Sequence, residues 1–134
     1  MTASRRKRLF IALALLALVF TLAGCRKQTV EEQFKTLTDA LTESGYAYTL
    51  APLAEEGRGE PVPIYDETVW YLVTLGEEEL LVYFDSSNRA EHLARQFCGG
   101  VTDARVTAFG LRYIILYRGA DEGVHALLDG LEKR

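Results

Sequence analysis

The N-terminal stretch limits what the rest of the chain can be, because it has the features of an export signal and not of a folded domain. A basic head, Arg5-Arg6-Lys7-Arg8, precedes a nearly continuous apolar run over residues 9–22. That run is shorter than the roughly 20 apolar residues that a helix needs to span a bilayer. This order is typical of a secretory signal peptide. We therefore expect residues 1–24 to be removed and the remainder to fold outside the cytoplasm.

The apolar run ends in Leu22-Ala23-Gly24-Cys25, which resembles the lipobox of bacterial lipoproteins at all four positions. The resemblance implies cleavage between Gly24 and Cys25 and a covalent lipid on the sulfur of Cys25. Two or three acyl chains would hold the protein at the cell membrane, since each buried methylene contributes about 0.8 kcal/mol. An ordinary cleaved signal and an uncleaved short anchor are the alternatives. Both still place the remaining chain on the extracytoplasmic side.

The length and charge of the chain after residue 24 indicate one acidic domain. About 110 residues remain, which is enough for one hydrophobic core and too few for two. Four of the 15 Lys and Arg residues lie in the basic head, so 11 basic residues face 19 acidic residues, a net charge of −8. This charge argues against a nucleic-acid partner. With Cys25 lipidated, Cys98 is the only other cysteine, so the domain must fold without an intramolecular disulfide.

Hydrophobic periodicity divides the mature chain into helices and strands after a short tether at residues 25–28. We expect helices over residues 29–44, 87–98 and 121–133, and strands over residues 46–53, 68–75, 79–85, 104–109 and 112–118. This order, α-β-(ββα)-(ββα), predicts a single α+β domain over residues 29–134. Its antiparallel sheet would have four to five strands, with the helices in a second layer on one face. The two ββα units match weakly at a spacing of about 34 residues, which indicates either a repeat or chance.

Local signals suggest where two of the helices begin and end. Thr29 and Glu32 have the spacing of a capping box at the start of the first helix, and Gly45 can end it. Ser86 or Ser87 can cap the second helix, whose apolar side would include Phe97.

Alternation along the strands assigns side chains to the two faces of the sheet. The more apolar set, expected beneath the helices, is Leu80, Val82, Phe84, Ile114 and Leu116. The candidate binding face carries Tyr83, Tyr113, Ile115 and Tyr117, with Arg105 and Thr107 from the neighbouring strand. Tyr and Arg dominate many binding hot spots because they combine apolar contact with a polar group. The same residues also suit a half-exposed sheet that binds nothing, and both interpretations stay open.

Motifs for catalysis or metal binding are missing from the sequence. It has no closely spaced cysteine pair, no His-Glu-x-x-His, no phosphate-binding glycine loop and no Gly-x-Ser-x-Gly. His92 and His125 occupy comparable helix positions without a third ligand, and Glu77-Glu78-Glu79 would make a weak calcium site at best. Cys98 lies at a helix C-terminus, where a thiolate is disfavoured. We therefore expect no catalytic residue, no metal and no cofactor other than the lipid on Cys25.

The mature part resembles a group of small, largely uncharacterised bacterial lipoproteins with an α+β domain. The similarity is carried by Val82-Tyr83-Phe84-Asp85-Ser86 running into one helix, and by Tyr113-Ile114-Ile115-Leu116-Tyr117-Arg118-Gly119 running into the last one. No activity is implied by these residues. We expect a non-catalytic binding or accessory domain that meets an envelope protein or a small ligand. The alternative is a small envelope enzyme or enzyme inhibitor with an unrecognised site.

Overall fold

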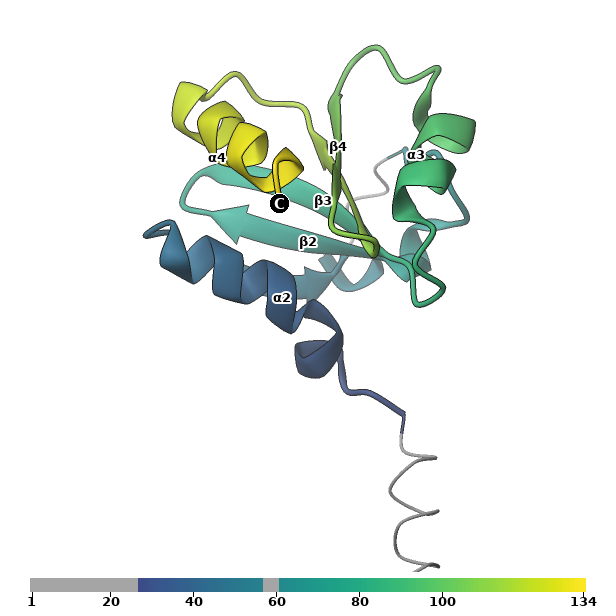
Figure 1. Ribbon diagram of the computed structural model, residues 1–134, viewed down its shortest axis with the longest axis horizontal. Coiled ribbons are helices and arrows are strands. Elements are labelled where there is room, and N and C mark those ends of the chain that lie inside the picture. The colour runs from purple at the N-terminus through teal and green to yellow at the C-terminus, as the bar shows by residue number, and fades with distance from the viewer. Residues whose placement is uncertain (1–26, 57–60) are drawn as a thin grey trace, which may run out of the picture. The chain divides into compact units, whose positions relative to one another are not determined.

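The computed structural model describes residues 27–56 and 61–134 (Figure 1). The predicted signal peptide, its cleavage site at Gly24 and Cys25, and the start of the tether lie outside the described residues. The chain divides between Glu32 and Gln33 into two units, and the domain considered below is the second, Gln33–Arg134. None of the helices in the described ranges combines the length and the apolar character needed to cross a membrane.

The centre of the domain is a five-stranded antiparallel sheet, which confirms the predicted α+β class. In spatial order the strands are β1 (Thr49–Pro52), β2 (Trp70–Leu75), β3 (Glu78–Phe84), β5 (Tyr113–Tyr117) and β4 (Arg105–Phe109). Two hairpins supply the four longer strands, and β3 and β5 join the hairpins at the middle of the sheet. Gly76 and Gly110 follow the first strand of each hairpin with positive φ angles of 65° and 58°, a conformation that favours glycine.

Three α-helices pack on this sheet: α2 (Val30–Glu43), α3 (Ala90–Cys98) and α4 (Glu122–Glu132). Two short 3-10 helices, η1 (Leu53–Glu56) and η2 (Glu67–Val69), lie in the connection from β1 to β2. In Figure 1, α4 and α3 lie on either side of β4. The helices therefore cover both faces of the sheet, and the prediction that they share one face is wrong.

The pairing between β3 and β5 explains this arrangement. Leu81 lies opposite Leu116, and both contribute to the core cluster that also contains Leu93 and Cys98 of α3. One residue earlier, Leu80 lies opposite Tyr117, so these two side chains point to the other face. The predicted apolar set therefore mixed the two faces, because alternation fixes the side chains within a strand but not the register between distant strands.

The same geometry rules out a rotational repeat. Both units run strand, strand, helix, and their inner strands β3 and β5 are antiparallel neighbours. A two-fold rotation about an axis perpendicular to the sheet would superpose one hairpin on the other. Such a rotation does not exchange the two faces of the sheet, so it would place α3 and α4 on the same face. Since α3 and α4 lie on opposite faces, the two ββα units differ in handedness. The weak sequence match thus reflects similar composition and order, and not a repeated structure.

The helix ends agree with the sequence signals in one case and differ in another. The Thr29 and Glu32 side chains each accept a hydrogen bond from the other's backbone N–H, at 3.2 and 3.0 Å, which confirms the capping box. Neither Ser86 nor Ser87 caps α3. Instead the buried Asp85 carboxylate accepts hydrogen bonds from the backbone N–H groups of Ser87 and Arg89, at 3.1 and 2.5 Å. Serine has a high propensity to cap a helix, but here the Asp85 carboxylate accepts the hydrogen bonds of the loop before α3.

Replacing Asp85 by Ala should destabilise the domain by about 1–3 kcal/mol at neutral pH, because the backbone N–H groups of Ser87 and Arg89 lose a charged acceptor. Burial alone would raise the pKa of Asp85, but the hydrogen bonds from Ser87 and Arg89 outweigh it and lower the pKa below its ordinary value. A folded-state pKa below the unfolded one stabilises the folded domain near neutral pH, and this contribution disappears as the pH falls below about 4.

Urea unfolding at pH 7 and at pH 3 measures this effect. The difference between the wild-type chain and Asp85→Ala should shrink at the lower pH. Ser86→Ala is the control and should unfold like the wild type at both pH values. A difference that is equally large at pH 3 would contradict the role assigned to the carboxylate.

Candidate functional site

The structure does not form the predicted binding face. Tyr83, Tyr113 and Tyr117 are buried, with 9%, 2% and 1% of their surface exposed. The strand register also separates them. Tyr113 and Tyr117 share a face with Arg105, whereas Tyr83 lies opposite Ile114 and points to the other side. The prediction that these residues make one accessible surface is therefore wrong, since α2 and α4 cover one side and α3 with residues 61–69 covers the other.

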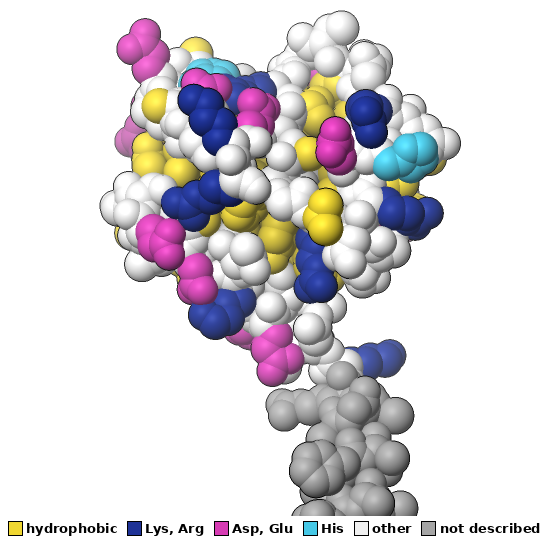
Figure 2. All heavy atoms as spheres, in the orientation of Figure 1, with side chains coloured by type: hydrophobic (Ala, Val, Ile, Leu, Met, Phe, Trp, Pro, Cys, Tyr) yellow, Lys and Arg dark blue, Asp and Glu magenta, His cyan; other side chains and the backbone are white. Residues whose placement is uncertain are grey.

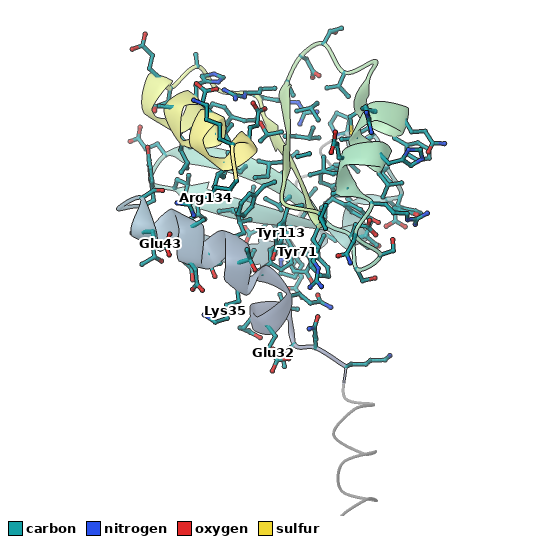
Figure 3. The ribbon with its side chains drawn as sticks, viewed as in Figure 1. Glu32, Lys35, Glu43, Tyr71, Tyr113 and Arg134 are labelled. Atoms are coloured by element: carbon teal, nitrogen blue, oxygen red, sulfur yellow. The ribbon has the colours of Figure 1, made fainter. Side chains whose placement is uncertain are left out.

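Tyr113 belongs to an aromatic cluster beneath α2 (Figure 3). Its ring lies 5.9 Å from Phe34, 5.6 Å from Phe84 and 5.7 Å from Phe109, measured between ring centroids. Its hydroxyl donates a hydrogen bond of 2.5 Å to the carbonyl oxygen of Gln33 in α2. Tyr113 thus attaches α2 to the sheet, and its polar group is used inside the fold.

Tyr117 joins the two hairpins to α4 through its hydroxyl. This group donates to the Glu78 carboxylate at 2.5 Å and accepts from the backbone N–H of Asp121 at 3.0 Å. Burial and the bond to Glu78 raise the pKa of Tyr117. Gly119 must lack a side chain here, because a Cβ would overlap both the Tyr117 hydroxyl and the Glu78 carboxylate.

Arg105 is held against α4 by four contacts and is not free at the margin of a binding face. Its guanidinium donates to Asp129 at 2.6 Å and to the His125 carbonyl at 3.1 Å, and lies 3.3 Å from the His125 ring and 3.5 Å from Glu132. The bond from Arg105 lowers the pKa of Asp129. His125 is therefore part of a structural network, as is Thr107, which donates to Glu132 at 3.3 Å.

Tyr83 lies between two other aromatic side chains on the α3 face. The ring of Trp70 is 5.5 Å away, and the exposed ring of Tyr65 stacks on it at 5.8 Å. The Trp70 indole N–H donates to the Ile64 carbonyl at 2.7 Å, which fixes the connection before β2. Burial, together with the nearby Tyr65 and Asp85, raises the pKa of Tyr83 to about 12. Tyr83 is thus neutral near pH 7 and acts as a core residue.

The remaining candidates for chemistry are dispersed in the part of the chain that the structure describes. Cys98 is buried in the α3 core cluster, and burial raises the pKa of its thiol. His92 is exposed on α3, far in sequence from the network around His125. Across residues 27–56 and 61–134, no three His, Cys, Asp or Glu residues are placed to hold a metal ion. Phe97, expected in the core, is 46% exposed at the end of α3.

A small hollow of about 220 Å³ opens beside the acidic turn between β2 and β3. Its apolar lining comes from η1 and three strands, and its polar lining from the turn and the segment after β5. The residues around it are Leu53, Leu72, Glu77, Glu78, Glu79, Leu81, Leu116, Tyr117, Arg118 and Gly119. Arg118 is engaged with Asp103 at 3.1 Å and with the Pro61 carbonyl at 3.0 Å. Sequence reasoning found the acidic turn but missed the hollow, because Leu53 arrives from a distant segment.

A larger hollow of about 490 Å³ lies beside the hairpin end of the edge strand β4. It lies between α3 and α4 and is bordered by Glu91, Ala108, Gly110, Leu111, Glu132 and Arg134. Arg134 also pairs with Glu43 of α2 at 3.2 Å, and Figure 3 shows these two side chains approaching each other. We call this hollow the β4 groove. Sequence analysis missed it as well, because its walls come from two helices far apart in the chain, and the exposure of Leu111 is seen only in the structure.

Replacing Tyr117 by Phe should destabilise the domain by about 1–2 kcal/mol, because it leaves the Glu78 carboxylate and the Asp121 N–H without their partner. Thermal or urea unfolding measures the loss. Tyr48→Phe is the matched control, since Tyr48 is 39% exposed and should lose almost nothing. Equal stability of the two variants would show that the Tyr117 hydroxyl does not hold the hairpins and α4 together.

Comparison with known proteins finds no matching family model, no similar curated protein and no similar solved structure.

Proposed function

We propose that this chain is a lipid-anchored protein of the extracytoplasmic membrane surface, and that its α+β domain is a non-catalytic binding or accessory module. The observation that carries the proposal is the sequence Leu22-Ala23-Gly24-Cys25 directly after a basic head and an apolar run. Only a thiol at the fourth position can accept the lipid of the bacterial lipoproteins that this motif resembles. The proposal therefore places the anchor on Cys25 and the domain at the membrane surface.

The way the polar side chains are used supports a binding role over a catalytic one. Arg105 and His125 hold α4 against β4, Tyr117 holds the two hairpins and α4 together, and Asp85 fixes the loop that leads into α3. A catalytic group must be within reach of a substrate and free to exchange a proton. These groups are instead engaged in contacts that stabilise the fold, which suits a module that acts through its surface.

Two of the hollows in the described part of the chain differ in the partner that they suit. The hollow beside the acidic turn, at about 220 Å³, is smaller than most sites for drug-sized ligands. The β4 groove borders an edge strand of the sheet, and its lining combines Ala108 of β4 with residues of α3 and α4. Strand edges of this kind bind other polypeptides by extending the sheet. The proposed module is therefore one that meets a protein at the membrane.

Replacing Cys25 by Ala should abolish lipid attachment and leave an unprocessed precursor. The measurement is incorporation of labelled palmitate by bacteria that express the full chain, followed by membrane fractionation. Cys98→Ala is the matched control, because it removes the other cysteine from a buried site and should leave the labelling unchanged. Undiminished labelling of the Cys25→Ala chain would exclude the proposed anchor.

A further inference from the structure

The hollow beside the acidic turn has an apolar floor made by three neighbouring strands. Leu72 of β2 pairs with Leu81 of β3, and Leu81 pairs with Leu116 of β5, so their side chains form one row on the same face. Leu53 of η1 borders this leucine row, and all four leucines are at most 6% exposed. The helix η1 packs on β1 and β2, and α3 packs on β4 and β5. The hollow thus lies where the row passes between these two covers.

The polar lining of the hollow carries more negative than positive charge. It consists of Glu77, Glu78 and Glu79 together with Arg118. Arg118 is paired with Asp103 at 3.1 Å, so its charge is already compensated. The exposed Glu77 side chain makes no hydrogen bond or ion pair with the residues in the ranges 27–56 and 61–134. A carboxylate without a partner beside an apolar floor favours a ligand that has a cationic end and an apolar body.

We propose that this hollow binds a small primary aliphatic amine, with its alkyl chain over the leucine row and its ammonium group beside Glu77 and Glu78. The Tyr117 hydroxyl donates to one oxygen of the Glu78 carboxylate, which holds this acceptor in place. Glu77 follows Gly76 in the turn and is exposed, so its side chain can adjust to the ligand. The proposal concerns the domain alone, and it depends neither on the lipid at Cys25 nor on a protein partner.

The volume of the hollow limits the length of the amine. A water molecule occupies about 30 Å³ in the liquid, and a methylene group has a similar size. A volume of about 220 Å³ therefore has room for about seven such groups. This corresponds to one nitrogen and about six carbons in an unbranched chain. The carbons beyond the sixth would extend into solvent and gain little.

A series of unbranched amines, from propylamine to octylamine, tests the apolar part of the site. The full chain is held in phosphatidylcholine nanodiscs, the free ligand concentration is measured, and the methyl NMR signals of Leu72 and Leu81 report binding at the hollow itself. Each added methylene should tighten binding about fourfold up to hexylamine. Octylamine should bind only slightly more tightly than hexylamine. An affinity that does not depend on chain length would overturn the assignment of the leucine row as the floor.

Hexylamine and hexanol together separate the contribution of the charge from that of the chain. The wild-type chain should bind hexylamine more tightly than hexanol, and hexanoate least tightly. Glu77→Gln should weaken hexylamine binding about threefold, as expected for one exposed ion pair, and should leave hexanol binding unchanged. Because Glu77 is exposed, this variant should fold normally, and circular dichroism checks this.

Glu91→Gln is the matched control for the charge. It removes the same charge from an exposed side chain that borders the β4 groove, and it should bind hexylamine like the wild type. Figure 2 shows acidic and basic side chains interspersed on the face that it presents. A ligand attracted only by the overall charge of the domain would respond equally to both variants, which would overturn the proposed site.

Two further results would overturn the proposal. Equal binding of hexylamine and hexanol would mean that the hollow recognises only an apolar chain. The second result concerns N-acetyl-lysine methylamide, which carries the same ammonium group on four methylenes attached to a polypeptide backbone. If it binds more tightly than butylamine, the hollow is a site for a lysine side chain of another protein, and its assignment to a small amine is wrong.

Discussion

The register between β3 and β5 is the constraint on which the rest of the domain depends. These two strands are the only link between the hairpins within the sheet as described, and Leu81 pairs there with Leu116. A slip of one residue would move every side chain of one hairpin to the opposite face. The Tyr117 hydroxyl would then lose its hydrogen bond to Glu78, and α4 would lose the side chains on which it packs. The position of each helix, and of both hollows, follows from this one pairing.

Much of the fold can be predicted from the sequence because its signals are local. The hairpins follow from apolar runs separated by Gly76 and Gly110, and α2 follows from a capping box and a periodic apolar face. The register between hairpins cannot be predicted in this way, because it depends on contacts between residues far apart in the chain. Layer and face assignments fail for the same reason. Tyr83 and Tyr117 were grouped together, although each packs beneath the helix of its own hairpin.

The candidate sites were less predictable than the fold. Tyr and Arg suggested a recognition face, but their polar groups are used inside the molecule: Tyr113 binds α2, and Arg105 binds α4. A side chain that suits an interface equally suits a half-polar core, and composition cannot separate the two. The β4 groove carries little sequence signal, since its walls come from helices on opposite faces. The two edge strands differ in one respect that the sequence shows. β1 ends at Pro52, and proline at a sheet edge hinders pairing with another chain, whereas β4 has no proline.

The Tyr117 hydroxyl has a consequence for when the β4 groove exists at all. It joins Glu78 of the first hairpin to the N–H of Asp121 at the start of α4, and α4 forms one wall of the groove. That wall is complete only after the two hairpins have paired. A chain that has folded only one hairpin therefore presents no complete groove, so this surface belongs only to molecules that have finished folding.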